Sequence, residues 1–209
     1  MLRMVLVVVL GLMASQAAAR QLGPPIIPLF ISPAGEPFRI DAGEPYPVGA
    51  WFKGADANRD GTLSKDEFRA DALRFFGVLD TNGDGRVAGR EVSVYETELA
   101  PEILRRAPPP PREVADRRAL ITPRADKPLD RGVVPPELRE GAGLYGLLNE
   151  PQPVTGADLD LNGLITRDEW GKAADRRFQL LDTNADGGLT RAELPQAPVE
   201  ALLPTAPAQ

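Results

Sequence analysis

The segment Asp56–Glu67, DANRDGTLSKDE, carries oxygen-bearing side chains at its first, third and fifth positions, glycine at its sixth and glutamate at its twelfth. The same arrangement returns in Asp80–Glu91 (DTNGDGRVAGRE), Asp158–Glu169 (DLDLNGLITRDE) and Asp182–Glu193 (DTNADGGLTRAE). These segments, called loops 1 to 4, begin at 56, 80, 158 and 182, so the members of each pair start 24 residues apart. One Asp/Asn/Gly cluster is ordinary turn chemistry, but four with a shared spacing are not chance.

Calcium is the ion that this arrangement suits. Ca²⁺ takes about 6–8 oxygen ligands at roughly 2.3–2.6 Å, so a short loop has to wrap around it and direct oxygens inward. The glycine permits the sharp turn, the backbone carbonyl at position seven contributes an oxygen, and the glutamate closes the site with both carboxylate oxygens. Mg²⁺ requires tighter octahedral geometry, so the bidentate glutamate favours Ca²⁺. The sequence predicts up to four Ca²⁺ ions, held by Asp56, Asn58, Asp60, Thr62, Ser64 and Glu67; Asp80, Asn82, Asp84, Arg86 and Glu91; Asp158, Asp160, Asn162, Leu164, Thr166 and Glu169; and Asp182, Asn184, Asp186, Gly188, Thr190 and Glu193.

Positions eight and nine carry further information. Ala88 at position nine of loop 2 has no oxygen to ligate an ion or to hold a water, whereas the other loops have Ser or Thr there. Loop 2 is therefore the weakest predicted site. Position eight, through which two such loops pair in a short β-bridge, is apolar in every loop: Leu63, Val87, Ile165 and Leu189.

One helix, not two, fits between the loops of each pair. In the first pair, apolar residues recur at i, i+4, i+7, i+8 and i+11 from Phe68, which is a helical period. A helix over Ser64–Leu79 has 16 residues and spans ~24 Å, so its two loops lie at opposite ends and cannot bridge each other. The second half repeats this pattern at an offset of 102 residues, as an internal duplication. If the two shared helices pack antiparallel, loop 1 meets loop 4 and loop 2 meets loop 3.

The flanking segments predict shorter elements. Pro47–Ala55 is expected to enter loop 1 as a helix, and Arg90–Arg106 to leave loop 2 as another. The prolines after loop 4 allow only a short turn there. The predicted organisation is a signal peptide at 1–19, an extended N-terminal segment at 20–46, a first loop pair at 47–106, a Pro- and Arg-rich connector at 107–146, a second pair at 147–203 and a tail at 204–209.

The loops resemble those of the EF-hand superfamily. With the short loop spacing, an export signal and the stretch Ser32–Arg39 (SPAGEPFR), the chain is similar to exported EF-hand proteins of alphaproteobacteria. The resemblance implies an all-α fold of duplicated helix-loop-helix pairs, each with a shared helix, and calcium ligation by the residues above. Dockerin modules, which bind cohesins, are a second resemblance, but Glu at position twelve and the long connector depart from their pattern.

The residue inventory argues against an enzyme. The chain has no histidine and no cysteine, so it lacks the usual general base, any thiol nucleophile and any disulfide. It also has no phosphate-cradling glycine loop and no nucleophile elbow, and nothing in it indicates nucleic-acid binding.

The N-terminus predicts export. Arg3, the apolar run Val5–Ala14 and the small residues Ala17 to Ala19 form a signal-peptide pattern, so we expect a periplasmic or secreted protein with no membrane span after cleavage. An uncleaved anchor is the alternative, although the apolar run is short for a span of about 20 residues.

Two roles for calcium compete. In one role, calcium stabilises the fold or the protein buffers calcium. In the other, the protein is a sensor that exposes an apolar groove to an unidentified protein partner when calcium binds. Sensors favour Met-rich grooves, whereas the three methionines of this chain all lie within its first 13 residues. The structural or buffering role is therefore the sequence-based prediction.

Overall fold

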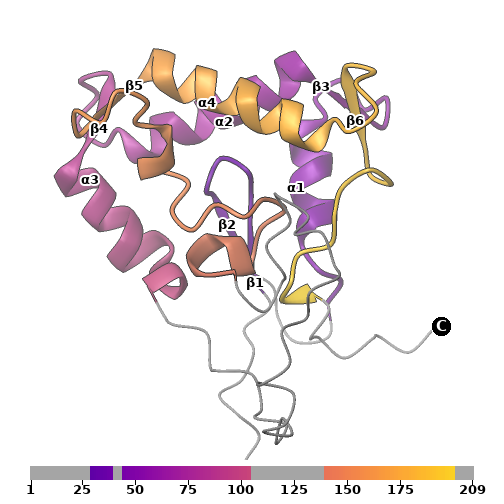
Figure 1. Ribbon diagram of the computed structural model, residues 1–209, viewed down its shortest axis with the longest axis horizontal. Helices are drawn as coiled ribbons and strands as arrows, with labels where there is room; N and C mark the ends of the chain where they lie inside the picture. Colours follow the sequence, from indigo (N-terminus) through magenta and orange to yellow (C-terminus); the bar gives the residue numbers. More distant parts are fainter. Residues whose placement is uncertain (1–28, 40–43, 105–138, 201–209) are drawn as a thin grey trace, which may run out of the picture.

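Two helices of equal length, called the central helices, lie side by side along the top of the view in Figure 1. They are α2 (Lys65–Leu79) and α4 (Arg167–Leu181), each of 15 residues. The indole Nε1 of Trp170 donates a hydrogen bond of 2.7 Å to the backbone oxygen of Ala72, which ties α4 to α2 in the interior. The computed structural model describes residues 29–39, 44–104 and 139–200.

The sequence sets the ends of both central helices in the same way. Ser64 and Thr166 cap the N-termini in complete capping boxes, in which the cap side chain accepts from the backbone of the following Glu67 or Glu169. Each helix ends where the next loop begins, at Asp80 and at Asp182. Glu67 and Glu169 are thus both the last residue of a loop and part of a helix cap, so the same side chains stabilise the loop and the helix.

The loops pair between the halves and not within them. Strand β3 (Thr62–Ser64) is antiparallel to β6 (Gly188–Thr190), and β4 (Arg86–Ala88) is antiparallel to β5 (Leu164–Thr166). The position-eight residues face each other, Leu63 with Leu189 and Val87 with Ile165, and all four are buried. The predicted cross-pairing of loop 1 with loop 4 and of loop 2 with loop 3 is confirmed.

The all-α prediction is wrong. The described residues contain six three-residue strands in three two-stranded sheets. Two of these sheets form because the backbone around the buried position-eight residues hydrogen-bonds to the partner loop. Buried backbone N–H and C=O groups require such partners. The third is the hairpin β1 (Leu29–Ile31) and β2 (Pro37–Arg39), in a segment expected to be coil. It turns at Ser32–Gly35, where Gly35 donates to the oxygen of Ser32 at 2.8 Å with φ of +97°, a conformation that glycine tolerates.

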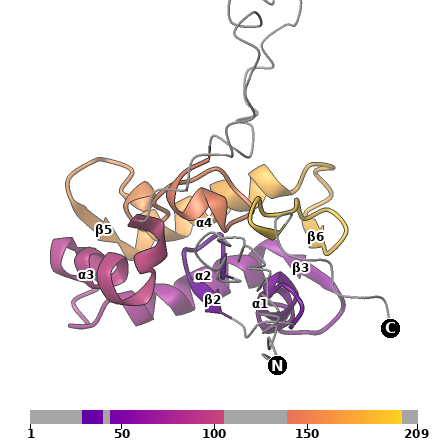
Figure 2. The same cartoon turned by 90° about the horizontal axis from the view of Figure 1, so that it is seen from below.

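The peripheral helices are shorter than expected. Helix α1 (Val48–Ala55) enters loop 1 as predicted, but the helix predicted over Arg90–Arg106 is broken. It begins as α3 (Gly89–Val94) and ends before Pro101, where a proline ring and missing N–H stop an α-helix. The short non-α helices are the π-helix η1 (Tyr95–Leu99) and the 3₁₀-helices η2 (Pro101–Leu104), η4 (Gly141–Leu144) and η5 (Thr155–Ala157). Figure 2 shows α1 and α3 at opposite ends of α2.

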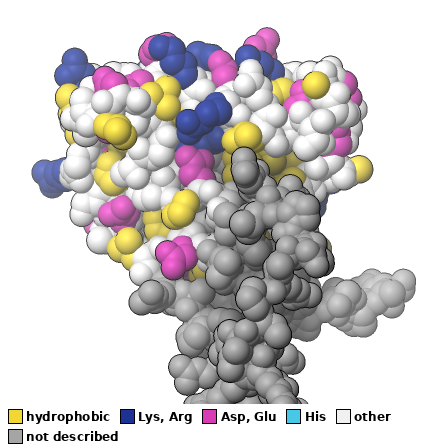
Figure 3. All heavy atoms as spheres, in the orientation of Figure 1, with side chains coloured by type: hydrophobic (Ala, Val, Ile, Leu, Met, Phe, Trp, Pro, Cys, Tyr) yellow, Lys and Arg dark blue, Asp and Glu magenta, His cyan; other side chains and the backbone are white. Residues whose placement is uncertain are grey.

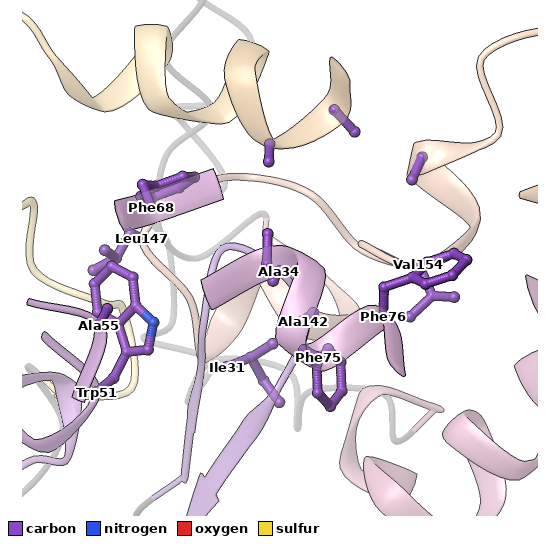
Figure 4. Close-up of a cluster of buried hydrophobic side chains, with 14 of the residues drawn as sticks. Ile31, Ala34, Trp51, Ala55, Phe68, Phe75, Phe76, Ala142, Leu147 and Val154 are labelled. Carbon is purple, nitrogen blue, oxygen red and sulfur yellow. The ribbon is translucent and has the colours of Figure 1, made fainter. Parts of the chain in front are cut away.

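One hydrophobic cluster includes residues from both halves (Figure 4). Phe68 of α2 lies edge-on to Phe178 of α4 at a ring-centroid distance of 5.6 Å, and Phe76 lies edge-on to Trp170 at 5.8 Å. The hairpin closes the cluster from below, with Leu29, Phe30 and Ile31 all buried. The aromatic residues predicted for the core are therefore in it.

Several predictions concern residues outside the described ranges. These are the signal peptide at 1–19, the connector from 107 to 138 and the tail at 204–209. Among the described residues, no helix is long and apolar enough to cross a bilayer.

Candidate calcium sites

Each loop is organised around the aspartate at its first position. The backbone N–H of the glycine at position six donates to Oδ2 of that aspartate at 2.8–3.1 Å in all four loops. The glycines have φ between +79° and +86°, a left-handed conformation that a residue without Cβ adopts at no steric cost. The four pairs are Gly61 with Asp56, Gly85 with Asp80, Gly163 with Asp158 and Gly187 with Asp182.

Positions three and five curl the loop inward. In loop 1, Oδ1 of Asn58 accepts from the N–H of Asp60, and Oδ1 of Asp60 accepts from the N–H of Thr62, at 2.9 and 2.8 Å. The other three loops repeat both bonds at 2.7–3.2 Å. In every loop the asparagine amide also donates to the neighbouring carboxylate at 2.8–3.1 Å, which holds these two predicted ligands together.

In loops 1, 2 and 3 the glutamate at position twelve folds back on the start of its loop. Glu67 accepts from the N–H groups of Ala57 and Asn58 with Oε1, and from the N–H and hydroxyl of Ser64 with Oε2. The Ser64 hydroxyl, followed by the Ser64 N–H, lowers the pKa of Glu67. In loop 3 the N–H and then the hydroxyl of Thr166 lower the pKa of Glu169 in the same way. Both carboxylates are thereby held in the ionised form that a cation requires.

The residues present fit a calcium ion. The predicted ligands Asp158, Asp160 and Glu169 offer carboxylate oxygens that all lie within 4.8 Å of one another. Oxygens that share an ion at about 2.3–2.6 Å lie at most roughly 5 Å apart, so this spacing suits Ca²⁺. In loop 4, Asp182, Asp186 and Glu193 form a second such cluster.

Two carboxylate oxygens supply an independent observation. Oδ1 of Asp56 in loop 1 and Oε1 of Glu193 in loop 4 are buried and accept no hydrogen bond. A buried anionic oxygen without a donor is costly, whereas a coordinated cation would satisfy it. These two loops are the ones that β3 and β6 join. Coordination by the predicted ligands remains a prediction in all four loops.

The side chain at position nine orients the loop glutamate, a role that the sequence analysis did not distinguish from metal ligation. The hydroxyls of Ser64, Thr166 and Thr190 each donate to the glutamate of their own loop, at 2.6–2.8 Å. Ala88 can offer Glu91 only its backbone N–H, at 3.1 Å. Loop 2 therefore lacks the position-nine hydroxyl bond, and the hydroxyl that donates to Glu91 there is that of Thr81 at position two, at 3.2 Å.

The sequence reading missed the left-handed residue at position four. Arg59, Leu161 and Ala185 have φ of 61°, 61° and 57°, and Gly83 has 72°. Non-glycine residues rarely adopt this region. Gly83 in loop 2 was the available signal, since glycine is the residue that such a position favours.

A buried ion pair was also missed. Arg177 of α4 is 1% exposed and donates from Nε and Nη2 to Glu150 at 2.7 Å each, and from Nη2 to the oxygen of Pro153 at 2.6 Å. It fastens the segment before loop 3 to the central helix. The 102-residue offset places Arg177 opposite Phe75, and this substitution of a charge for a core aromatic was the signal.

The comparisons with known proteins agree with this geometry in part. The family model described as EF hand matches residues 48–70 and 173–196. These matches contain loops 1 and 4 complete, support the EF-hand superfamily and suggest calcium binding. Proteins of this family are typically non-enzymatic. No curated protein and no solved structure matches the chain significantly, so no homologue supports the resemblance to exported alphaproteobacterial proteins.

Proposed function

We propose that the chain binds up to four Ca²⁺ ions, one in each loop, as an exported protein in which calcium has a structural or buffering role. The observation that carries the proposal is the repeated hydrogen-bond pattern, in which backbone N–H groups orient the aspartates and the glutamate of every loop. These bonds limit the rotamers of the ligands once a loop is folded, which lowers the ordering cost of binding in the folded state.

Loops 2 and 3 extend the proposal beyond the two family matches. Loop 3 has one of the two carboxylate clusters, and loop 2 has the same glycine and asparagine bonds as loop 1. The strands β4 and β5 join these two loops in the same register that joins loops 1 and 4. The two loop pairs are therefore equivalent in architecture.

A structural role follows from the position of the loops at both ends of the central helices. Without a cation, each loop brings together three carboxylates at ligand positions within twelve residues, and their repulsion opposes the fold. Binding and folding are then coupled, since the ligand set exists only in the folded state. The hydrophobic cluster runs between the two helices and is closed by the hairpin, which favours a fixed core over a groove that opens.

The alternative is a sensor with a protein partner. A sensor requires two arrangements of helices that calcium binds with different affinity. Extracellular modules typically bind calcium at about 10⁻⁴–10⁻³ M and sensors at about 10⁻⁷–10⁻⁵ M, so affinity separates the roles.

The test is a calcium titration of EDTA-stripped protein by calorimetry, with far-ultraviolet circular dichroism before and after. The proposal expects about four sites and a gain of helix on binding. A control that replaces both buried orphan carboxylates, Asp56→Asn with Glu193→Gln, is expected to remove the sites of loops 1 and 4 and leave the other two. Micromolar sites on an already helical apo protein would indicate the sensor, and an absence of calcium uptake would overturn the proposal.

A further inference from the structure

Loop 3 places three leucines on the surface. Leu159, Leu161 and Leu164, at positions two, four and seven, are 42%, 86% and 39% exposed. Together they form what we call the apolar tip. Exposed leucines occur singly on most proteins, but three within six residues of one loop form a patch.

Calcium ligation does not require these leucines. At the same three positions loop 1 has Ala57, Arg59 and Thr62, loop 2 has Thr81, Gly83 and Arg86, and loop 4 has Thr183, Ala185 and Gly188. Those loops have the same backbone hydrogen bonds without any apolar residue larger than alanine at these three positions. The apolar tip is therefore a property of loop 3 that the shared fold does not explain.

Two features of Leu161 are energetically unfavourable in the free protein. Its side chain is almost fully in water, and its φ of 61° places a bulky residue in the left-handed region. Glycine occupies the same position in loop 2 at φ of 72°. The loop geometry imposes this conformation in all four loops, so the feature particular to loop 3 is the exposed leucine that adopts it.

Three exposed arginines lie on the elements that adjoin loops 2 and 3. They are Arg86 on β4, Arg90 on α3 and Arg167 at the start of α4, where the guanidinium lies 6.0 Å from the Phe76 ring centroid, and together we call them the basic rim. The register of β4 with β5 places Arg86 opposite Thr166 and Ala88 opposite Leu164, so Arg86 lies on the strand that pairs with the one carrying Leu164. Figure 3 shows hydrophobic and basic side chains next to each other over the end where β4 and β5 lie.

Calcium changes the sign of the charge at this end. The carboxylates predicted to bind in loops 2 and 3 are three per loop and carry −6, two Ca²⁺ ions contribute +4 and the basic rim +3, which leaves +1. Asp168 is not part of this set, because it pairs with Lys172 at 2.7 Å. The end that repels anions without calcium attracts them when calcium is bound.

We propose that, when calcium fills loops 2 and 3, the apolar tip inserts into the interfacial region of an anionic phospholipid bilayer while the basic rim contacts the headgroups. Leucines at an interface and arginines beside anionic lipid are a favourable combination. The tip is a convex projection, as the exposure of Leu161 requires, so it suits a deformable lipid surface better than the groove of a folded partner. This inference rests on the calcium binding proposed above.

The first experiment uses the absence of cysteine from the chain. Full-length Leu161→Cys is labelled with a polarity-sensitive thiol dye and mixed with vesicles of equal parts phosphatidylcholine and phosphatidylglycerol. Ala185→Cys, at the same position of loop 4 and with the same backbone conformation, is the matched control. We expect a blue shift at 161 with calcium that EGTA reverses, no shift at 185, and no shift with pure phosphatidylcholine.

The second experiment is co-sedimentation of Leu159→Thr/Leu161→Gly, with the residues that loop 2 carries at those positions and with Leu164, a predicted ligand, left in place. Removing two insertable leucines should weaken calcium-dependent vesicle binding by about a hundredfold, with the calorimetric calcium affinity unchanged. Any binding through the apolar N-terminal run would persist in EGTA and in this variant. The matched control, Leu180→Ala at the β3–β6 end, removes an exposed leucine outside the tip and should bind vesicles normally.

The outcomes separate the two proposals. Normal calcium uptake with no shift at 161, or with vesicle binding that survives the double substitution, overturns membrane docking and leaves the calcium function intact. Calcium-induced self-association without vesicle binding identifies a second copy as the occupant of the tip and also overturns membrane docking. Absence of calcium uptake overturns both.

Discussion

Substituting one loop glutamate should weaken a calcium site in the other half of the sequence. Oε2 of Glu193 accepts from the N–H and the hydroxyl of Thr190, both at 2.8 Å, while Oε1 is buried and free for a cation. In Glu193→Gln only one oxygen remains, so either these bonds or the metal contact is lost. Charge-assisted hydrogen bonds contribute about 1.5–3 kcal/mol, which corresponds to a loss of about 10- to 150-fold in affinity at loop 4.

The calcium affinity of loop 1 should also fall, because strand β6 of loop 4 pairs with strand β3 of loop 1. The buried pair Leu63 and Leu189 and its flanking strand bonds carry the coupling. Coupling between sites is typically about 1–3 kcal/mol, and the lower end predicts roughly a fivefold loss at loop 1. Loop 3 shares helix α4 with loop 4 but no strand, so it should bind normally.

Amide NMR provides one reporter for each loop. The position-six glycines donate to the first aspartate, so their amide signals follow occupancy of each site. In Glu193→Gln we expect Gly187 and then Gly61 to require more calcium, with Gly163 unchanged. The control Glu169→Gln should shift the titration of Gly163 and Gly85 instead. If Gly163 responds to Glu193→Gln and Gly61 does not, coupling runs along the helix and the reasoning from cross-paired strands is refuted.

Three further predictions concern single sites and the core. Ala88→Thr should add a position-nine hydroxyl bond to Oε2 of Glu91, beside the Thr81 hydroxyl bond to Oε1, and strengthen that site by about 1 kcal/mol, as read by calorimetry. An unchanged affinity would contradict the capping role of position nine. In urea titrations of the calcium-saturated protein, Trp170→Ala should lower the free energy of unfolding by about 3–5 kcal/mol. The control Trp170→Phe should lower it by much less. A small effect for alanine would show that the two helices do not share one core. The apo protein should lose stability as pH falls below the unfolded glutamate pKa of about 4.3. The lowered folded pKa of Glu67 and of Glu169 contributes stability that is full above that value and is lost as pH falls through the folded pKa. A flat acid profile in circular dichroism would disagree.

The loops and the central helices were predictable because local rules decide them. Glycine at position six, the asparagine and aspartate turns and the capping by Ser64 all act within a few residues. The apolar period from Phe68 defined the shared helix, and its length of ~24 Å excluded pairing within a half. Cross-pairing followed from geometry alone once the helices were taken as antiparallel.

What could not be predicted depends on contacts far apart in sequence. The β1–β2 hairpin packs beneath both halves, and Tyr46 fixes it by donating to the oxygens of Leu29 and Tyr145, 17 and 99 residues away. Burial raises the pKa of Tyr46, as expected for a phenol that has to stay protonated to donate these bonds. The apolar residues of Ile26–Phe38 have no periodicity that indicates a packing partner, so the sequence predicted coil for this segment.

The two kinds of connection form a closed circuit. Helix α2 joins loop 1 to loop 2, strands β4 and β5 join loop 2 to loop 3, helix α4 joins loop 3 to loop 4, and strands β6 and β3 return to loop 1. A duplicated unit that paired within itself would have produced two separate circuits and two cores. Because a shared helix is too long for its own loops to meet, each half leaves two strand edges that only the other half can pair, and the duplication is itself what completes the fold.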